Sequence, residues 1–450
     1  CYTFQYMPGA ITYLDTPVVS IAAFANPVDF PVDCERPSET PMIATVTRDE
    51  RDGDPGPFVV DGDRIDVLSM GVVQVPNPEW DSTDPASPRF IERDYSFPPG
   101  NKRVILEALD GSGTYNLDNG VNSLTRVNRT VEGVPPGEYQ VAVANLVGGG
   151  PGAATGDIIT PTGVTLTVGI IVDGVEKVVR PNDVNGVAFT GDVHRVLAGG
   201  SIQDVIDIAG NGDLILVPPG AYDELLVMWK PVKLQGYGAG SVFLNARQVP
   251  TEKVLAWRAK VDSLLLAGEI DPLPGQEVAA AGFPALGAGQ FPTEEGAGIF
   301  VAGKEVGLNR FGRPENRGAR IDGFTIVGAS QGGAIVANGY NQFLNISNNR
   351  LTSNAGFYGG GIRVGHPALT VEDVDLGLIH TDAVNDQIRI HHNHIAQNGN
   401  TFGGAGAGIS LHTGADAYRV QQNWICGNYS QGDGAGIGHL GRSHNGLIED

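Results

Sequence analysis

The sequence predicts an all-β chain in two parts, an antiparallel β-sandwich followed by a solenoid of stacked parallel coils. Three observations support this fold class. The 64 glycines and 29 prolines make up about a fifth of the 450 residues, against a usual ~12%, which indicates frequent turns. Residues 41–169 alternate apolar and polar side chains between turn signals spaced ~10 residues apart. From Ile321 onward, one short apolar template recurs along the chain.

Charge and composition exclude several classes of protein. The chain has 29 Lys and Arg against 51 Asp and Glu, a formal net charge of -22, and no run concentrates the basic residues. It is therefore not a general nucleic-acid binder. Its 41% hydrophobic content argues against disorder, and no stretch approaches ~18 apolar residues, so we expect no transmembrane segment. Because the chain starts without a Met or a signal peptide, we expect a processed protein or a piece of a longer one.

Residues 1–40 carry short aromatic and β-branched runs broken by Pro and Gly, which predicts the end of a preceding domain and its linker. The three cysteines, Cys1, Cys34 and Cys426, cannot form a disulfide framework. At most Cys1 and Cys34 are close enough in sequence to suggest a bridge, which leaves Cys426 single. Alternatively, Cys1 is the lipidated terminus of a lipoprotein.

Residues 41–169 are predicted to form the sandwich, because strands such as Val104–Leu106 and Tyr139–Val143 alternate and are bounded by turns. Four segments resemble the IPT/TIG branch of immunoglobulin-like domains: Pro41–Val46, Phe58–Asp66, Val134–Val141 and Gly163–Gly169. The resemblance implies an Ig-like spacer or binding module without chemistry of its own. Residues 170–198 are predicted to be a linker.

A helix is predicted at Ser201–Ala209, since its apolar residues fall on one face and Ser201 with Asp204 forms a capping-box-like start. A buried strand at Leu214–Val217 and a turn at Pro218–Tyr222 follow. This block resembles the N-terminal cap and first coils of right-handed parallel β-helix proteins of the pectate-lyase-like and NosD-like class. The resemblance implies a single-stranded solenoid with a short N-terminal capping helix, because the open end of a stacked sheet must be covered.

The β-helix is predicted to span residues 199–450, with two insertions, and to continue past residue 450. The first insertion, 248–318, begins with an exposed helix at Thr251–Ala267 and continues in a stretch rich in Gly, Ala and Pro. The second insertion, 367–386, accounts for the longest interval between repeats.

The internal repeat is the strongest sign of stacked coils. Its template is two apolar residues separated by four others, at intervals of 25, 44, 30 and 28 residues. The copies begin at Ile321, Ile346, Ile390, Val420 and Ile448. A second template, Gly-x-Gly-Ile or Gly-Gly-Ala-Ile, supplies another strand of each coil. Its isoleucines are Ile299, Ile335, Ile362, Ile409 and Ile437.

Three copies of the first template hold an asparagine at the fourth place: Asn349, Asn393 and Asn423. This column resembles the asparagine ladder of parallel β-helices. The resemblance implies that each asparagine adopts φ > 0 at an inward turn and bonds the backbone of the neighbouring coils.

Histidines are the candidate metal ligands, because eight of the nine lie between His366 and His444. Imidazoles stacked on successive coils suit Cu or Zn, and the NosD-like resemblance implies periplasmic copper handling. The candidates are His366, His412 and His439, which meet only if the turns of their coils differ in length. The alternative is that they are turn and surface histidines.

An acidic loop provides the candidate Ca²⁺ ligands Glu372, Asp373 and Asp375, since Ca²⁺ takes six to eight oxygens, often from such loops. The alternative is that these are solvated carboxylates of an acidic chain. Arg363, on the strand beside this loop, is the candidate base of a polysaccharide lyase, with a surface arginine as the alternative. The hydrolase pattern of polygalacturonases is absent, since the chain has neither an Asp-Asp pair nor Asn-Thr-Asp.

Trp424 and Tyr429 are candidates for stacking sugars in a groove of the last coil, and Trp424 filling a turn is the alternative. Three functions follow. The first is a non-catalytic extracellular, cell-surface or periplasmic protein that binds polysaccharide or another surface protein, or assembles with itself. The second is a polysaccharide lyase or hydrolase with catalytic coils near or beyond the C-terminus. The third is a copper-handling protein associated with a multicopper-oxidase-like upstream domain. The missing catalytic motifs favour the first.

Overall fold

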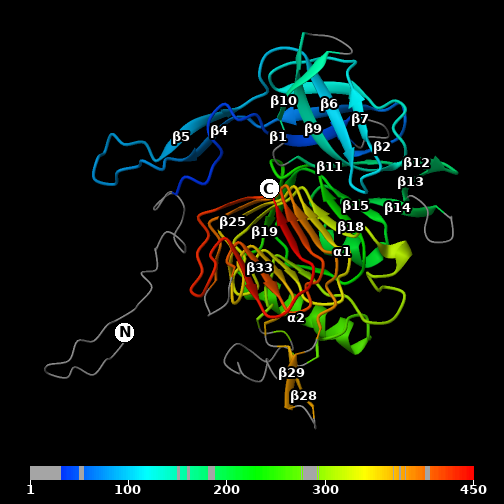
Figure 1. The fold of residues 1–450 in the computed structure, drawn as a ribbon, viewed down its shortest axis with the longest axis vertical. Helices are drawn as coiled ribbons and strands as arrows, with labels where there is room; N and C mark the ends of the chain where they lie inside the picture. Colours follow the sequence, from blue (N-terminus) through cyan, green and yellow to red (C-terminus); the bar gives the residue numbers. More distant parts are fainter. Residues whose placement is uncertain are drawn as a thin grey trace.

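The computed structural model describes residues 32–49, 55–148, 153–159, 163–180, 188–274, 276, 291, 293–367, 369–373, 377–380, 382–400 and 406–449. These residues form strands and the turns and loops that join them, together with the helices α1 (Ile202–Ile208) and α2 (Thr251–Leu266) and a 3-10 helix at Pro314–Asn316. Figure 1 shows a sandwich at the top and a stack of coils beneath it. The predicted fold class, all-β with a solenoid-like part, is confirmed. No helix among the described residues is long and apolar enough to cross a membrane.

Two sheets form the sandwich, and their facing side chains share one apolar core. The first sheet consists of β1 (Ile43–Arg48), β3 (Arg64–Ser69) and β8 (Arg126–Thr130). The second consists of β2 (Phe58–Val59), β11 (Thr165–Val168), β9 (Gly137–Val147), β6 (Lys102–Ala108) and β7 (Thr114–Leu117), with β10 (Ala154–Ile159) beside β9. Apart from β2 with β11, neighbouring strands run antiparallel. An arm of β4 (Gly71–Pro76) and β5 (Phe90–Tyr95) extends to the left in Figure 1.

The central strand β9 is buried on both faces, since Tyr139–Ala144 are all buried. One face belongs to the sandwich core, and the other lies on the coils, where the amides of Gln140 and Asn348 pair at 2.8 and 3.1 Å. On β11, the backbone N–H and the hydroxyl of Thr165 donate to Asp322 at 2.8 and 2.6 Å. These paired polar groups fix the sandwich on the coils, because each would be costly to leave buried and unpaired.

The span predicted to be a linker, 170–198, instead carries three strands. They are β12 (Ile170–Val172), β13 (Val175–Arg180) and β14 (Phe189–Arg195), which pair antiparallel in order. β14 then pairs in parallel with β15 (Leu214–Val217), the first strand of the coils. The added strands cover a sheet edge whose backbone groups would otherwise lack partners.

Three parallel sheets form what we name the coil stack, and successive coils contribute one strand to each sheet. The first sheet continues from β15 through β18 (Lys233–Gly236), β21 (Arg320–Asp322), β24 (Asn345–Ser347), β30 (Arg389–His391), β34 (Arg419–Gln421) and β37 (Leu447–Glu449). The second consists of β16 (Gly220–Tyr222), β19 (Val242–Asn245), β22 (Thr325–Val327), β25 (Arg350–Thr352), β31 (His394–Ala396) and β35 (Trp424–Cys426). The third consists of β17 (Leu226–Met228), β20 (Ile299–Val301), β23 (Ile335–Ala337), β27 (Ile362–Val364), β33 (Ile409–His412) and β36 (Ile437–Leu440).

The strand register confirms both repeat templates. The leading residues of the first template, from Ile321 to Ile448, pair in order across the first sheet. The isoleucines of the second template, from Ile299 to Ile437, pair in order across the third. Most of them are fully buried, and burying such a side chain contributes ~1.5 to 3 kcal/mol relative to leaving it exposed.

Both predicted helices are present, and one differs in burial. In α1, the Ser201 hydroxyl accepts a hydrogen bond from the backbone N–H of Asp204, which confirms the predicted cap. Helix α2 was expected to be exposed, but one face packs on the coil stack. Its buried residues are Val254, Trp257, Val261 and Leu264. The Trp257 ring meets Phe300 of β20 edge-on, with centroids 5.4 Å apart.

The predicted insertions also differ in detail. The first, 248–318, is two loops rather than one, because β20 lies within it and belongs to the third sheet. The second, 367–386, contains the antiparallel hairpin of β28 (Thr370–Asp373) and β29 (Gly377–His380). This hairpin projects below the coil stack in Figure 1. A short parallel pair, β26 (Ala355–Gly356) and β32 (Gly399–Asn400), lies at a turn.

The asparagine ladder is confirmed, with one correction. Oδ1 of Asn393 accepts from the backbone N–H of Asn349 at 3.0 Å, and Oδ1 of Asn423 accepts from that of Asn393 at the same distance. The positive φ was expected at these asparagines, but it belongs to the residue before each of them. Those residues are Asn348, His392 and Gln422. A second ladder, which the sequence analysis missed, lies five residues further along each coil and consists of Asn354, Asn398 and Asn428.

The disulfide joins Cys34 to Cys426, 392 residues apart in the sequence and 5.4 Å apart between Cα atoms. The expected pairing of Cys34 with Cys1 is therefore wrong, and Cys1 lies outside the described residues. Proximity in the sequence was misleading because the last coils bring Cys426 back to the N-terminal segment.

Candidate functional site

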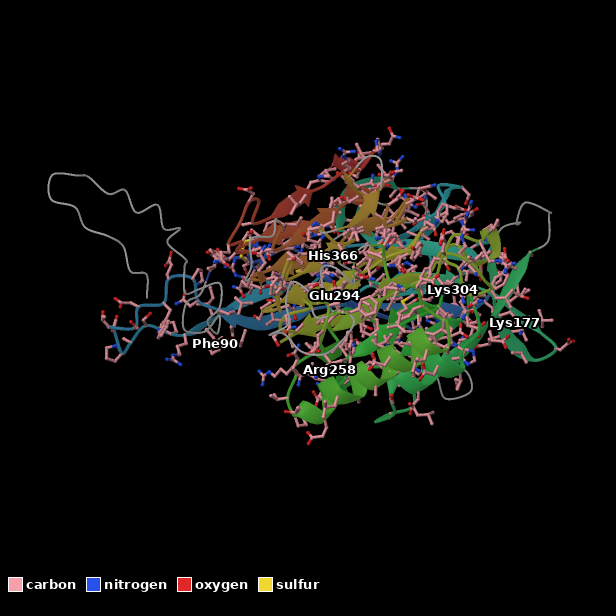
Figure 2. The ribbon with its side chains drawn as sticks, turned by 90° about the horizontal axis from the view of Figure 1, so that it is seen from below. Phe90, Lys177, Arg258, Glu294, Lys304 and His366 are labelled. Atoms are coloured by element: carbon pink, nitrogen blue, oxygen red, sulfur yellow. A yellow bond between two sulfur atoms is a disulfide. The ribbon has the colours of Figure 1, made fainter. Side chains whose placement is uncertain are left out.

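The catalytic candidate Arg363 lies inside the coil stack. Its side chain and that of Glu294 are each about 1% exposed, and the two form an ion pair. Nε2 of His366 lies 3.6 Å from Oε1 of Glu294 and 3.3 Å from the hydroxyl of Thr293. We name Glu294, Arg363 and His366 the Glu294 cluster, and Figure 2 shows Glu294 and His366 within the stack. Arg363 is thus neither a surface arginine nor placed to take a proton from a polysaccharide.

Charge in the Glu294 cluster is balanced. Burial raises the pKa of Glu294, but Arg363 and His366 outweigh burial, so this pKa is lowered. Burial, together with repulsion from Arg363, lowers the pKa of His366 to about 4, against the attraction of Glu294. At neutral pH, one carboxylate therefore lies beside one guanidinium and a neutral imidazole.

The three metal candidates occupy different environments. His412 is buried, with Nε2 2.7 Å from the hydroxyl of Ser410, and the ring of Tyr358 lies edge-on to both His366 and His412. His439 is exposed on β36. Across the described ranges, no group of three or more His, Cys, Asp or Glu is placed to hold a metal ion. Binding of Cu at these histidines stays a prediction.

The Ca²⁺ candidates lie on the projecting hairpin. Glu372 and Asp373 belong to β28, and Asp375 falls outside the described residues. Ca²⁺ binding at this hairpin stays a prediction.

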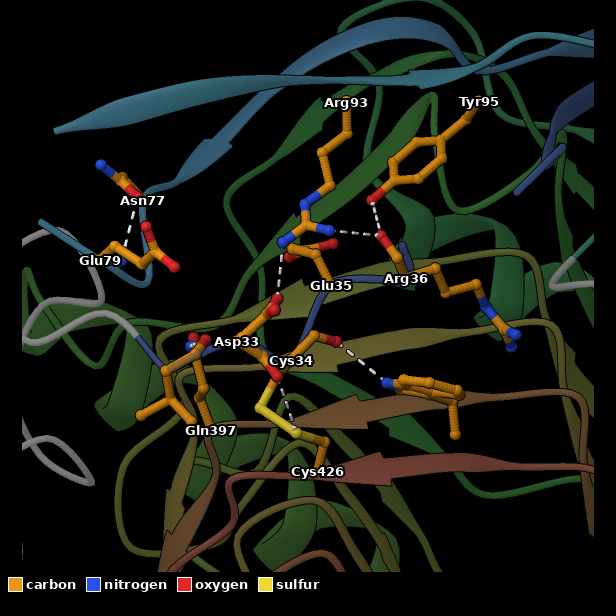
Figure 3. A network of polar contacts seen from close by, with 12 residues as sticks. Asp33, Cys34, Glu35, Arg36, Asn77, Glu79, Arg93, Tyr95, Gln397 and Cys426 are labelled. Atoms are coloured by element: carbon orange, nitrogen blue, oxygen red, sulfur yellow. Dashed lines mark hydrogen bonds and ion pairs between the residues drawn. A yellow bond between two sulfur atoms is a disulfide. The ribbon is translucent and has the colours of Figure 1, made fainter. Parts of the chain in front are cut away.

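Trp424 is partly covered by another segment of the chain. Residues 32–37, which we name the strap, lie across the second sheet, where Cys34 forms its disulfide (Figure 3). The indole N–H of Trp424 and Nε2 of His394 each lie 3.0 Å from the Cys34 carbonyl oxygen. The guanidinium of Arg36 lies 4.8 Å from the centroid of the Trp424 ring. The strap therefore covers part of this tryptophan, which remains partly exposed, and sugar binding here stays a prediction.

The strap also ties the arm of the sandwich to the coil stack. Asp33 pairs with Arg93 of β5 at 2.8 Å, and the Tyr95 hydroxyl donates to the Arg36 carbonyl at 2.7 Å (Figure 3). Glu35 forms an ion pair with Arg350 of β25. The other sugar-stacking candidate, Tyr429, lies at a turn, where its carbonyl accepts from the backbone N–H of Asn400 at 3.0 Å.

A groove lies between the sandwich and the first sheet, and we name it the interface groove. It consists of adjoining hollows of about 730, 590 and 310 Å³, all of which Leu109 of the β6–β7 turn lines. The middle hollow crosses β24, β30, β34 and β37, where Asn345, Arg389, Arg419 and Leu447 line it. Because parallel strands lie ~4.8 Å apart, this floor extends for about 14 Å along the stack.

Three guanidinium groups line the middle hollow: those of Arg317, Arg389 and Arg419. None of them forms an ion pair with a carboxylate of the described residues. Arg317 lies 4.1 Å from the centroid of the Phe343 ring, and Arg389 donates to the Leu109 carbonyl at 2.7 Å. Burial lowers the pKa of Arg389, and the neighbouring Arg419 lowers it further. Positive charge is therefore concentrated here in a chain of net charge -22.

A second charge cluster lies beneath this groove, and we name it the Glu138 cluster. It consists of Glu138, Arg180, Lys233 and Arg320. Glu138 forms ion pairs with Lys233 and, at 2.9 Å, with Arg320. The side chains of Lys233 and Arg320 are fully buried, whereas that of Glu138 is 18% exposed and lines the groove. Nε of Arg180 and of Arg320 are buried without a hydrogen-bond partner among the described residues.

Charge in the Glu138 cluster is not balanced. Burial lowers the pKa of Lys233 to about 7, since the repulsion of Arg180 and Arg320 adds to burial and the attraction of Glu138 only partly offsets it. Burial opposes the ionised form of Glu138, but Lys233 and Arg320 outweigh it and lower the pKa of Glu138 to about 2. The cluster is therefore net positive at neutral pH, which favours an anion in the groove above it.

The interface groove was not predicted from the sequence, although the repeat contains part of the pattern that indicates it. A basic residue precedes the leading apolar residue of the template at Arg320, Arg389 and Arg419. Those positions share one column of the first sheet. Arg180, by contrast, comes from the span expected to be a linker, and Glu138 comes from the sandwich.

Fold and groove together define an all-β protein in which a sandwich and a solenoid-like stack of parallel sheets enclose a groove whose middle hollow is lined by three arginines. The chain matches no family model, no curated protein and no solved structure.

Proposed function

We propose that the protein binds acidic polysaccharide in the interface groove and is a non-catalytic protein of the cell surface, the periplasm or the extracellular space. The observation that carries this proposal is that Arg317, Arg389 and Arg419 line one open hollow and form no ion pair with a carboxylate of the described residues. Guanidinium groups bind carboxylates through paired N–H donors, so an acidic sugar is a fitting ligand.

The shape of the groove supports an extended ligand rather than a small anion. The middle hollow follows four strands, and its neighbours continue it at both ends. Arg389 and Arg419 are direct register partners on adjacent strands, so two acidic groups along one chain can be bound in succession. The net positive Glu138 cluster adds a fixed attraction that water cannot fully screen, because the cluster is buried.

The likenesses to IPT/TIG-like domains and to pectate-lyase-like or NosD-like β-helices are part of this proposal. A sandwich that acts as a binding module, placed on a right-handed β-helix, accounts for a groove formed by both. In this proposal the sandwich supplies one wall, through Leu109 and Glu138, and the coils supply the arginines.

The test is isothermal titration of the purified protein with polygalacturonate and with a neutral polysaccharide of similar length. We expect binding of polygalacturonate alone, and a ~10-fold or greater loss in the Arg389→Gln/Arg419→Gln variant, since each tenfold change corresponds to ~1.4 kcal/mol. The matched control, Arg247→Gln/Arg442→Gln, removes two exposed arginines outside the groove and should bind as the wild type does. Absence of binding to any acidic polysaccharide, or an equal loss in the control, contradicts the proposal.

A turnover assay tests separately the proposal that the protein is non-catalytic. Absorbance of unsaturated uronides should stay flat when the protein is incubated with pectin-type and alginate-type substrates. A rise with time, absent from a heat-denatured sample, would show a lyase and overturn this part alone.

A further inference from the structure

Two adjoining hollows of the interface groove, which we name its aromatic end and its arginine end, differ in chemistry. The 730 Å³ hollow is lined by the rings of Tyr115, Tyr139 and Phe189, together with Pro135 and Val179. The 590 Å³ hollow is lined by Arg389 and Arg419 and by polar side chains such as Gln387 and Asn445. Leu109, Asp110, Glu138, Arg317 and Gly318 line both hollows and form the junction between them. A ligand that fills both hollows must therefore present two kinds of surface.

The aromatic end is a fixed surface rather than a loose collection of rings. Tyr115 and Tyr139 lie edge to face with centroids 5.7 Å apart, and the Tyr139 hydroxyl donates to the Pro135 carbonyl at 2.7 Å. The Arg180 guanidinium packs against the Phe189 ring, 5.4 Å from the ring centroid. Aromatic rings offer flat apolar faces, which the C–H face of a sugar ring can cover.

The charged side chains also differ between the aromatic end and the arginine end. Of these two hollows, Arg389 and Arg419 line only the 590 Å³ one, whereas Arg180 and the carboxylate of Glu315 line only the aromatic one. At the aromatic end, the carboxylates of Asp110, Glu138 and Glu315 outnumber the guanidinium groups of Arg180 and Arg317, whereas at the arginine end three guanidinium groups outnumber two carboxylates. A carboxylate on the ligand is thus favoured at the arginine end.

We infer that the groove selects an acidic heteropolysaccharide in which charged and uncharged sugars alternate, with an uncharged sugar on the aromatic rings and its acidic neighbour on Arg389 and Arg419. This inference rests on the proposed function and narrows its ligand class. A polymer of acidic sugars alone fills the arginine end but places a carboxylate against the rings and beside Glu315. A neutral polymer leaves the arginines without a partner.

Three oligosaccharide probes of equal length test the inference in titrations with the full chain. They are a hyaluronan fragment, in which glucuronate alternates with N-acetylglucosamine, a galacturonate homopolymer, and a neutral glucan. We expect the hyaluronan fragment to bind ~10-fold more tightly than the homopolymer, and the glucan not to bind. Equal affinity for the two acidic probes, or tighter binding of the homopolymer, overturns the inference and leaves the proposed function standing. Failure of both acidic probes to bind overturns the proposed function itself.

Substitutions of the aromatic residues test whether their rings cause the preference for the hyaluronan fragment. Phe189→Leu and Tyr115→Leu keep apolar volume but remove the flat ring, and each should weaken binding of the hyaluronan fragment ~10-fold more than binding of the galacturonate homopolymer, so that the preference is lost. Phe243→Leu, on the exposed face of β19, is the matched control and should retain the preference. If Phe189→Leu weakens both acidic probes equally, the rings do not distinguish the sugars and the inference is wrong.

Discussion

Two buried charge clusters of this molecule each hold one carboxylate, and they differ in the cations around it. In the Glu294 cluster, Arg363 alone balances Glu294, because His366 is neutral at pH 7. In the Glu138 cluster, one carboxylate faces Arg180, Arg320 and Lys233, whose pKa is lowered to about 7, beneath a groove lined by further arginines. A balanced pair needs nothing more from its surroundings, whereas an excess of buried cations raises the free energy until an anion arrives. Charge balance, rather than burial, therefore separates the structural cluster from the binding site.

The largest effect should come from removing either carboxylate. Glu294→Gln and Glu138→Gln should each lower the free energy of unfolding by ~3 to 5 kcal/mol, since each leaves buried cations unpaired. Denaturation with guanidinium chloride measures both losses.

A second substitution distinguishes the clusters. Adding Arg363→Met to Glu294→Gln should recover most of the loss, because both charges of the pair are then gone. Adding Lys233→Met to Glu138→Gln should recover less, because Arg180 and Arg320 remain. Equal recovery in the two pairs would mean that the clusters do not differ in charge balance.

The strap provides a region that belongs to neither cluster. Replacing both Cys34 and Cys426 by Ser should lower the free energy of unfolding by ~2 to 4 kcal/mol, because the disulfide closes a long loop. Affinity for polygalacturonate should not change, since the strap lies on the second sheet and the groove on the first. A loss of affinity in this variant would show that the strap, rather than the polar interface at Gln140 and Thr165, holds the groove in shape.

At acidic pH, protonation of His366 should give the Glu294 cluster an excess of cations, as in the Glu138 cluster. The pKa of His366 is about 4 in the folded protein, against ~6.5 in an unfolded chain, so the unfolded chain takes up the proton first as the pH falls. Stability should therefore fall between pH ~6.5 and ~4. His366→Gln should reduce this fall by about 3 kcal/mol, measured by denaturation at several pH values. The exposed His439 supplies the control, since a fall reduced equally by His439→Gln would assign the effect elsewhere.

The smallest effect on stability should come from the groove itself. Arg419→Gln should change the free energy of unfolding by less than ~0.5 kcal/mol, because this side chain is exposed and forms no ion pair with the described residues. The same variant should bind polygalacturonate more weakly. A loss of stability comparable to that of Glu138→Gln would identify Arg419 as structural.

The coils could be predicted from the sequence because their signal is periodic. Ile346 and Ile390 stack at the predicted register, and Asn349 bonds Asn393 as expected. The sites could not be predicted, since they depend on contacts between distant segments. Arg389 meets Leu109 across 280 residues, and Arg363 meets Glu294 across 69. The sequence placed Arg363 beside an acidic loop, and the fold instead buries it against a carboxylate from another loop.

We propose that the Glu138 cluster, whose charge is unbalanced, marks the binding site, and that the balanced Glu294 cluster does not. Hydrogen exchange measured with and without polygalacturonate tests this proposal most directly. Peptides that contain Leu109, Arg389 and Arg419 should exchange more slowly when the ligand is present. Peptides that contain Glu294 and Arg363 should exchange at the same rate in both samples. Protection confined to the Glu294 and Arg363 peptides would contradict the account.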